Sequence, residues 1–398
     1  MRTFPCPARC SSARANEYTV HIVHIGPSQL PLRHARGGAI ERRMLELGAA
    51  QVSRGHQVTV YSAELQKSVT QFRGMEVRAL ACRHMGLARR WEFLFRAIRD
   101  LDSADVLHFH SVPEGALLAW NLRGLKALSY DYFQWRGTQL PILRWMYRQA
   151  LQKFDALLPV SDFCRSESMR YWGLPLECAR VLYNGVNVEQ FQPDLEARQR
   201  MRMELGLGAR LVVLYVGRVC HQKGTDLLLD AYAKLRRRMP EVMLVVAGPA
   251  ERFARQIGNS FTEEIPRAGG IYLGAVEETT LGALFNTCDI FVMPTRQHEM
   301  FGMAALEAQA CGKPVVCSRH GGLPEVVTEQ SARFFPTGDS GALATELESL
   351  LRSSEERQRM SIAARANAEK FSWQQVACDL DNIYAEKREV RLSWAVAK

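Results

Sequence analysis

Two successive series of short apolar runs, each alternating with helical segments, constrain the fold of this chain more than any other feature. In the first series the predicted strands are Thr19–Ile25, Gln57–Tyr61, Glu76–Leu80, Asp105–Phe109, Lys126–Tyr130, Ala156–Val160 and Arg180–Leu182. In the second they are Leu211–Val216, Val242–Ala247, Ile271–Leu273, Ile290–Met293, Pro314–Cys317 and Arg333–Phe335. This alternation is typical of doubly wound parallel sheets. It predicts an α/β protein with two Rossmann-like domains facing across a cleft.

The breaks between these series predict four segments. Residues 1–17 contain arginines but no apolar signal-peptide region, so we expect a disordered leader. The turn-rich stretch 184–193 predicts a hinge between an N-terminal domain at 18–189 and a C-terminal domain at 190–370. Residues 371–398 form a predicted terminal helix. The length of 398 residues allows each domain its own core.

A strand, loop and helix in the second series carry two glutamates with a glycine between them. Glu299 lies in the loop, and Gly302 opens a predicted helix that contains Glu307. Such a unit directs backbone N–H groups and the positive helix end out of the carboxyl edge of a parallel sheet, where a diphosphate can dock. The two carboxylates then suit the sugar and the ribose of a nucleotide-sugar. Taken alone, the pair fits a capped surface helix with solvated acids better.

Two cations follow the first strand of the same series. Arg218 and Lys223 come directly after the strand Leu211–Val216, with Gly217 and Gly224 beside them. Positive side chains at the carboxyl end of a strand match the charge of a diphosphate leaving group.

Read in order, these motifs resemble those of the retaining glycosyltransferases of family 4, which have the GT-B fold. The matching residues are Gly217-Arg218, Lys223-Gly224, Glu299-x-Phe301-Gly302 with Glu307, Gly312-x-Pro314-Val315, and Gly321-Gly322 with Glu325. The resemblance spans the chain from about Tyr18 to the C-terminal region. It implies a nucleotide-diphosphate-sugar donor, an acceptor on the side of the first domain, no cofactor, and a final helix that crosses back to the first domain.

The resemblance also implies roles for individual residues. Glu299, Arg218 and Lys223 become the catalytic candidates. The donor-binding candidates are Gly37, Gly38, Gly217, Arg218, Lys223, Gly248, Val276, Glu299, Phe301, Gly302, Met303 and Glu307.

The first domain contributes most of the candidates for contact with acceptor or sugar. Many family members place a histidine after the strand that corresponds to Lys126–Tyr130, whereas this chain has Tyr130 followed by Asp131. We therefore take Tyr130 and Asp131 as candidates, together with His110 and His298. The glycine pair before the helix at Ala39 would let the backbone approach the donor, although without the second half of the chain a simple strand-to-helix turn would explain it better.

No metal site is predicted. The Asp-x-Asp strings at 100–102 and 379–381 do not follow a strand, as a metal-binding pair of that kind would. His108 and His110 point to the same side of their strand, but no carboxylate or cysteine nearby completes a site. We expect them to line the cleft or to pack at the strand end. The ten scattered cysteines favour reduced thiols in a cytoplasmic protein.

Positive charge is concentrated in the first half of the chain. Residues 1–194 hold 25 lysines and arginines against 17 acids, and residues 195–398 hold 26 against 25. Because no nucleic-acid-binding motif accompanies this excess, an anionic membrane surface or anionic acceptor is the better match. Trp91, Leu94, Phe95 and Ile98 recur at helical spacing within a basic segment. They predict a helix whose apolar face packs on the core or, in the alternative, enters a membrane interface.

The expected function is thus a metal-independent, retaining transfer of a sugar to a lipid-linked or saccharide acceptor. We expect this transfer to belong to cell-envelope polysaccharide or glycolipid synthesis. The enzyme is expected to be cytoplasmic and to bind the membrane face peripherally. One alternative is an epimerase or hydrolase of nucleotide-sugars with the same fold. Another is a catalytically silent protein that binds nucleotide-sugars, against which the combination of Arg218, Lys223, Glu299 and Glu307 argues.

Overall fold

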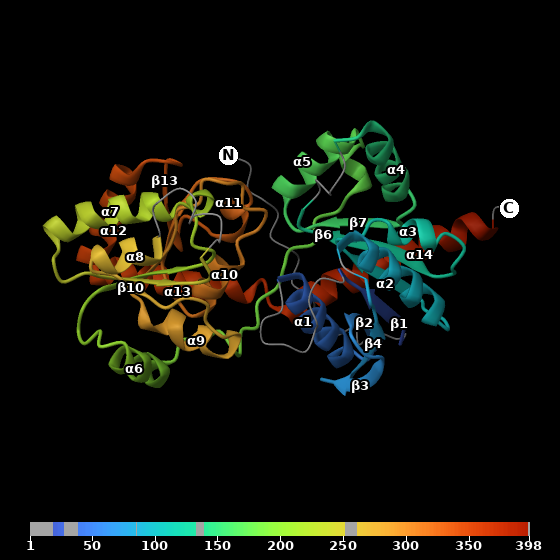
Figure 1. Ribbon diagram of the computed structural model, residues 1–398, viewed down its shortest axis with the longest axis horizontal. Coiled ribbons are helices and arrows are strands. Elements are labelled where there is room, and N and C mark those ends of the chain that lie inside the picture. Colours follow the sequence, from blue (N-terminus) through green and yellow to red (C-terminus); the bar gives the residue numbers. More distant parts are fainter. Residues whose placement is uncertain (1–18, 28–38, 85, 133–138, 251–260, 397–398) are drawn as a thin grey trace. The chain divides into compact units, whose positions relative to one another are not determined.

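The protein divides into two compact units, each built on its own sheet (Figure 1). The computed structural model describes residues 19–27, 39–84, 86–132, 139–250 and 261–396. The first unit comprises Met1–Val160, Arg165–Gly185 and Trp373–Lys398, and the second Ser161–Cys164 and Val186–Ser372. Both are α/β units with parallel sheets, which confirms the predicted fold class. The expected residues Gly37 and Gly38 and the expected leader lie outside the described residues.

The first unit has a seven-stranded sheet in the order β3-β4-β2-β1-β5-β6-β7, in which only the edge strand β3 is antiparallel. Its strands are β1 (His21–Ile25), β2 (Gln57–Glu64), β3 (Ser68–Phe72), β4 (Met75–Ala81), β5 (Val106–His110), β6 (Leu125–Tyr130) and β7 (Ala156–Pro159). Its helices are α1 (Ala39–Ser53), α2 (Gly86–Asp100), α3 (Gly115–Leu118), α4 (Pro141–Leu151), α5 (Asp162–Trp172), the 3₁₀ turn η1 (Leu176–Cys178) and α14 (Trp373–Val396). The first turn of α5 is grouped with the second unit.

The second unit has a six-stranded parallel sheet in the order β10-β9-β8-β11-β12-β13. Its strands are β8 (Val212–Val216), β9 (Met243–Ala247), β10 (Ile271–Tyr272), β11 (Ile290–Met293), β12 (Val315–Ser318) and β13 (Ala332–Phe335). Its helices are α6 (Leu195–Glu204), η2 (His221–Lys223), α7 (Thr225–Arg238), α8 (Phe261–Arg267), α9 (Glu278–Thr287), α10 (Met303–Ala310), α11 (Leu323–Val326), α12 (Ser340–Arg352) and α13 (Ser354–Glu369).

Strand order places a crevice in each unit. In both sheets the chain starts in a central strand, moves to one side, and then returns to the other side of that strand. The reversal lies between β1 and β5 in the first sheet and between β8 and β11 in the second. Ligands of open α/β sheets bind at the carboxyl ends of the strands at such a reversal. The fold therefore indicates where each unit's site should be.

The last helix belongs to the first unit. Trp373, Leu380 and Tyr384 of α14 are buried in one apolar cluster with β-strand residues such as Ile22 and Leu158. The Tyr384 hydroxyl is also 2.7 Å from Nδ1 of His108. This side of the first sheet is therefore covered by residues that are remote in the sequence.

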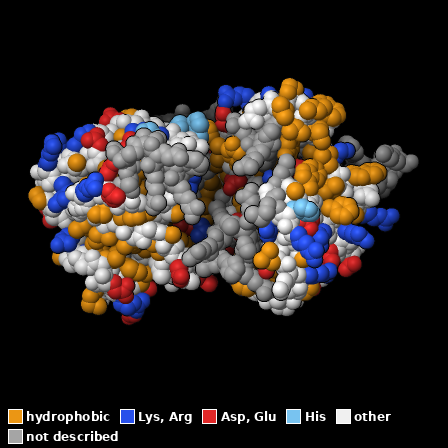
Figure 2. All heavy atoms as spheres, viewed as in Figure 1, with side chains coloured by type: hydrophobic (Ala, Val, Ile, Leu, Met, Phe, Trp, Pro, Cys, Tyr) orange, Lys and Arg blue, Asp and Glu red, His pale blue; other side chains and the backbone are white. Residues whose placement is uncertain are grey.

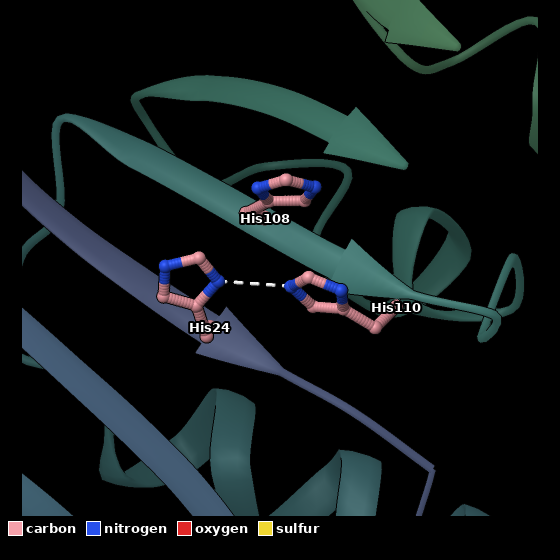
Figure 3. Close-up of side chains that lie close together, drawn as sticks. All are labelled: His24, His108 and His110. Atoms are coloured by element: carbon pink, nitrogen blue, oxygen red, sulfur yellow. Dashed lines mark hydrogen bonds between the residues drawn. The ribbon is translucent and has the colours of Figure 1, made fainter. Parts of the chain in front are cut away.

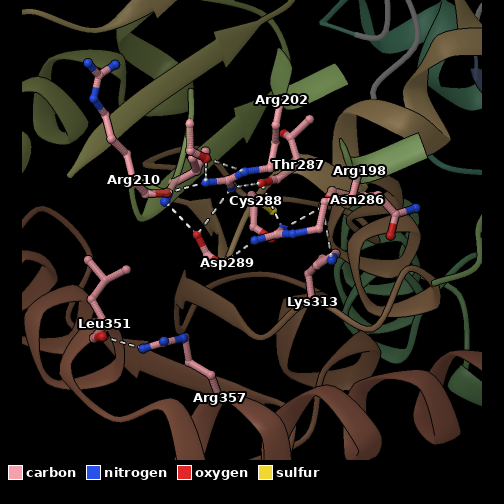
Figure 4. A network of polar contacts seen from close by, with 12 residues as sticks. Arg198, Arg202, Arg210, Asn286, Thr287, Cys288, Asp289, Lys313, Leu351 and Arg357 are labelled. Atoms are coloured by element: carbon pink, nitrogen blue, oxygen red, sulfur yellow. Dashed lines mark hydrogen bonds and ion pairs between the residues drawn. The ribbon is translucent and has the colours of Figure 1, made fainter. Parts of the chain in front are cut away.

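An arginine network stabilises the amino-terminal edge of the second sheet (Figure 4). Arg198 donates to the carbonyl oxygens of Asn286, Thr287 and Cys288 at 2.8–2.9 Å and to the carboxylate of Asp289 at 2.7 Å. These carbonyls close helix α9, so the network satisfies its last acceptors and ties α6 to it. Because it lies at the edge opposite to the strand ends that form the crevice, we assign it a structural role.

The structure corrects three expectations. β3 was not predicted because its residues are mostly exposed, and the predicted strand Arg180–Leu182 forms no strand. In α2 the core-packing alternative does not hold for the whole predicted face: Leu94 is buried, but Trp91 and Phe95 are 37% and 58% exposed. Seven described cysteines are free.

Candidate functional site

The loops after β8 and β11 meet at the reversal point of the second sheet. η2 ends in Lys223, and its ammonium group lies 2.5 Å from the Glu299 carboxylate. Both side chains are about four-fifths buried, with exposed fractions of 19% and 18%. The two candidates are 76 positions apart, and the fold pairs them at the carboxyl edge of the sheet. Arg218 is exposed on the same edge, directly after β8.

Glycines allow these loops to pack backbone against backbone. At Gly224 φ is +76°, and a Cβ atom would lie 1.9 Å from the carbonyl oxygen of Pro294. At Gly248, after β9, a Cβ would lie 1.9 Å from the oxygen of Gly217. Side chains at these positions would separate the loops. Close approach of the backbone therefore requires glycine at both.

The turn at Gly321 and Gly322 holds the loop that contains Glu299. The amide of Gly322 donates to the carbonyl of Glu299 at 2.7 Å, and Cβ atoms at Gly321 and Gly322 would collide with the backbone of Glu299 and Met300. The carboxylate of Glu325 accepts hydrogen bonds from the amides of residues 162 and 163 at 2.6 and 2.8 Å. These glycines thus position the loop, and Glu325 is engaged with backbone.

Helix α10 begins beside this loop. Its N-cap, Gly302, has φ +107°, and Met303 is its first residue. Glu307 lies in the second turn and is only 3% exposed. Phe301 is also buried, with its ring 6.1 Å from that of Phe371. An eight-residue helix whose amino end opens onto Glu299 supplies N–H donors and a positive dipole at this edge.

The remaining donor candidate, Val276, is half-buried in the loop between β10 and α9. His298, a sugar-contact candidate, is exposed and stacks on His320 with a centroid distance of 4.1 Å. Burial, and then the neighbouring His298, lower the pKa of His320. His320 was not predicted, because only the packing of the two loops reveals its proximity.

A pocket opens at the corresponding point of the first unit. It is small, with a volume of about 10 Å³ for the centres of water-sized molecules, and is lined by Ile40, Arg43, His110, Ser111, Ser129, Asp131 and Asn184. Two predicted candidates, His110 and Asp131, therefore lie together. Tyr130 is not among the lining residues: it is 1% exposed, and its hydroxyl is 2.9 Å from that of Ser168.

Ser111 has a strained backbone at this pocket. Its φ of +54° is in the left-handed region, which is unusual for a residue with a side chain. The amide of Ser111 donates to the carbonyl of Ser129 and its side chain to Asp131 at 3.1 Å, while Arg90 donates to its carbonyl. Strain of this kind, maintained by surrounding bonds, is concentrated at functional sites.

Comparison with known proteins supports the fold and the class. The family model "Glycosyl transferases group 1" matches residues 198–367 and "Glycosyltransferase Family 4" matches residues 36–190. The structure resembles that of Anabaena Alr3699/HepE in complex with UDP, with a TM-score of 0.76 at 17% identity, covering 92% of this chain and 100% of that one. The fold is therefore that of the GT-B glycosyltransferases.

Sequence relatives agree. The GDP-mannose-dependent alpha-(1-6)-phosphatidylinositol monomannoside mannosyltransferase of Mycolicibacterium smegmatis is 33% identical over 272 residues, which cover 64% of this chain and 68% of that protein. Spore coat protein SA of Bacillus subtilis is 25% identical over 391 residues, which cover 92% of this chain and 100% of that protein. This chain belongs to the group 1 glycosyl transferases, in family 4, and is a glycosyltransferase.

Proposed function

We propose that this enzyme moves a sugar from a nucleotide-diphosphate-sugar, bound by the second unit, to a lipid-linked or saccharide acceptor. The observation that carries the proposal is the Lys223–Glu299 pair at the sheet reversal, beside the amino end of α10. A diphosphate is stabilised by a cation and helix N–H groups, and a carboxylate can accept hydrogen bonds from sugar hydroxyls. The names of the mannosyltransferase relative and of the UDP complex are consistent with such donors.

Each catalytic candidate has a role in this proposal. Lys223 and Arg218 balance the negative charge that develops on the diphosphate as the sugar–phosphate bond breaks. Glu299 supports positive charge at the anomeric carbon, and Glu307 holds the ribose. Because protein cations and helix dipoles serve the leaving group, we propose that transfer needs no divalent metal and retains the anomeric configuration.

The direct experiment offers GDP-mannose, UDP-glucose, ADP-glucose and dTDP-glucose in turn, with and without EDTA, and follows both nucleotide release and glycoside formation. We expect release to depend on an added acceptor and to survive EDTA. Nucleotide release without acceptor would favour the hydrolase. Conversion of the donor into an isomer would favour the epimerase. Thermal stabilisation by the donor without any turnover would favour the silent binding protein. The anomeric proton coupling of the product reports retention or inversion.

We also propose that the acceptor lies at an anionic membrane surface. Exposed large apolar side chains gather on α2 and α4 and on the loops next to α3 and α4 of the first unit, where Figure 2 shows them clustered. This aromatic face consists of Trp91, Phe95, Trp120, Leu140, Ile142, Trp145 and Met146, which are 37–71% exposed. Arg96, Arg144 and Arg148 are exposed on the same helices. Aromatic rings beside arginines suit a lipid headgroup region.

No helix in the described part of the chain is long and apolar enough to cross a bilayer. Sedimentation with vesicles tests the proposal. Binding to phosphatidylglycerol vesicles but not to phosphatidylcholine vesicles at low salt supports a glycolipid or envelope-polysaccharide acceptor. If the protein stays in the supernatant with both kinds of vesicle, a soluble acceptor is favoured.

A further inference from the structure

Two tyrosines of the second sheet bind the backbone of the loops that follow its strands. Tyr215 belongs to β8, and its hydroxyl donates to the carbonyl oxygen of Arg218 at 2.7 Å. Tyr272 belongs to β10, and its hydroxyl donates to the carbonyl oxygen of Gly248 at 2.9 Å. Both carbonyls lie in the loops after β8 and β9, at the carboxyl edge of the sheet. The two hydroxyls therefore support loops of the proposed donor site from the side of the strands.

The peptide group that follows Arg218 is fixed at both of its polar atoms. Its carbonyl oxygen accepts from Tyr215, and its N–H, which belongs to Val219, donates to the carbonyl oxygen of Pro249 at 2.9 Å. Because a peptide group is planar, two bonds on its opposite sides set its orientation. The Arg218 side chain is exposed, whereas Val219 and Cys220 after it are 1% and 2% exposed. The fixed peptide thus sets the direction in which the guanidinium leaves the sheet edge.

The Tyr215 hydroxyl is closely packed beneath this loop. Tyr215 is 2% exposed, and a Cβ atom at Gly217 would lie 2.8 Å from its hydroxyl oxygen. Burial is the main cause that raises the pKa of Tyr215, so the hydroxyl stays protonated. A carbonyl oxygen can only accept, so this proton makes the bond to Arg218. Loss of the hydroxyl would remove one of the two bonds that orient the peptide.

A third tyrosine of the same unit makes similar bonds at the opposite edge. Tyr232 of α7 is 1% exposed, and its hydroxyl donates to the carbonyl oxygens of Val242 and Gly269 at 3.2 and 3.3 Å. These two residues precede β9 and β10, so they lie at the amino edge of the sheet. Tyr232 therefore stabilises backbone away from the donor loops, which makes it a standard of comparison for Tyr215.

Buried polar groups of the first unit are bonded within the core instead. His24 of β1 and His108 and His110 of β5 are at most 1% exposed, and His24 and His110 are 2.8 Å apart (Figure 3). Burial is the main cause that lowers the pKa of His24 to about 4 and the pKa values of the other two well below the usual range, so the rings are neutral at physiological pH. One nitrogen from each ring lies within 4.8 Å of the others, but both nitrogens of His108 already have partners at 2.7 Å. A metal ion would have to break those bonds, and the nearby charge of Arg43, which lowers all three pKa values, would repel it.

We propose that Tyr215 is a positioning residue for the donor: its hydroxyl orients the peptide after Arg218 and so directs the guanidinium toward the diphosphate of the nucleotide-sugar. Tyr272 acts one step further away, because it holds Gly248, and the next residue, Pro249, accepts the other bond of the same peptide. Both tyrosines act through Arg218. The inference rests on the proposed function, in which Arg218 balances the charge of the diphosphate, and deepens it by naming the residues that orient Arg218.

Calorimetric titration of the full chain with nucleotides tests the inference. Wild type is titrated with GDP, UDP, ADP and dTDP, and the diphosphate that binds most tightly is then compared with its own monophosphate. In Arg218→Ala we expect roughly 10- to 100-fold weaker binding of the diphosphate, the loss of one charged hydrogen-bonded contact, and little change for the monophosphate. In Tyr215→Phe we expect the same selective loss at roughly three- to tenfold, and in Tyr272→Phe a smaller selective loss.

A double variant separates positioning from a general loss of structure. Tyr215→Phe combined with Arg218→Ala should bind the diphosphate no more weakly than Arg218→Ala alone, because Tyr215 acts only through Arg218. Tyr232→Phe is the matched control, since it removes a buried hydroxyl that bonds backbone in the same unit. It should lower the melting temperature without changing the affinity for either nucleotide.

Four results would each overturn the inference. They are unchanged diphosphate affinity in Tyr215→Phe, an equal loss of monophosphate affinity, additive losses in the double variant, and the same selective loss in Tyr232→Phe. Should Tyr215→Phe fail to fold, the half-buried Tyr272→Phe decides by the same criteria. Wild-type diphosphate affinity in Arg218→Ala, or no binding of any of the four diphosphates to wild type, would instead reject the proposed donor site and the inference with it.

Discussion

The ion pair between Lys223 and Glu299 lets the two charges of the proposed donor site satisfy each other. At 2.5 Å the ammonium and carboxylate are in direct contact and largely shielded from water. A bound diphosphate would attract the same ammonium, so donor binding and release of Glu299 toward the sugar become linked. Both residues were predicted from the motifs, but not their contact, since it depends on how two loops pack.

Removal of the Lys223 charge should impair the chemical step. We expect Lys223→Ala to lower kcat by roughly 10²–10³, the usual cost of losing one group that stabilises charge in the transition state. Steady-state kinetics with saturating donor measure it. Lys234→Ala is the control, because it removes a lysine paired with Asp230 on the exposed side of α7 in the same unit. Activity of Lys223→Ala within a few-fold of wild type would refute the assignment.

The two glutamates should respond differently to neutralisation. Glu299→Gln should reduce kcat more than it raises KM, because its charge matters most when the anomeric carbon becomes positive. Glu307→Gln should mainly weaken donor affinity, since it is proposed to hold the ribose. Donor titration by calorimetry, combined with initial rates, separates the effects. If each variant showed the pattern expected of the other, the two roles would have to be exchanged.

His24 shows where residue-level prediction ends. His108 and His110 were recognised as a pair from their alternating positions on one strand, but their third partner lies on β1, more than eighty residues earlier. Only the parallel register of β1 and β5 brings them together. A single sequence contains no local signal for that register.

At the scale of elements, apolar runs were sufficient to predict most strands, because both faces of a parallel sheet are buried. The predicted strand Lys126–Tyr130 corresponds to β6 at Leu125–Tyr130. The polar edge strand β3 gave no such signal. In α2 the helical spacing was recognised, but spacing alone does not say which stripe faces the core.

Gly224 offers a test of how the elements of the proposed donor site are packed. We expect Gly224→Ala to destabilise the protein by at least about 2 kcal/mol more than Gly208→Ala. Both glycines have positive φ, at +76° and +56°, so both substitutions carry the same backbone cost, but a Cβ at Gly208 meets nothing within 4 Å. Urea unfolding compares them. Equal losses would show that contact with Pro294 does not decide the conformation.

The aromatic face makes a prediction for its helices. Adding a charge with Trp145→Glu should weaken binding to anionic vesicles roughly tenfold, because a buried aromatic ring is worth about 1.5–3 kcal/mol. Ile362→Glu is the matched control: it alters a residue that is 66% exposed on α13 of the second unit. If both variants bind as wild type does, the aromatic face is not the lipid-binding surface.

For the whole molecule, the neutral histidines predict acid sensitivity. Their pKa values are lower in the folded than in the unfolded state, so the unfolded chain binds more protons and stability falls as pH drops below about 6.5 toward 4. For His24 alone the loss at pH 5 is about 2 kcal/mol. Urea unfolding at pH 7.5 and 5.0 should show it. The side chain introduced by His24→Gln cannot titrate, so in this variant the difference between the free energies of unfolding at the two pH values should be smaller by that amount.

The place of α14 in the first unit has a consequence during synthesis. Trp373 and Tyr384 complete a cluster whose members outside α14, from Val20 to Leu182, were all translated at least 190 residues earlier. The nascent first unit must therefore wait, with Ile22 and Leu158 uncovered, while the ribosome makes the entire second unit. Chaperone demand should concentrate in that interval, and a chain released before Trp373 should be recovered as aggregate even though its second unit is complete.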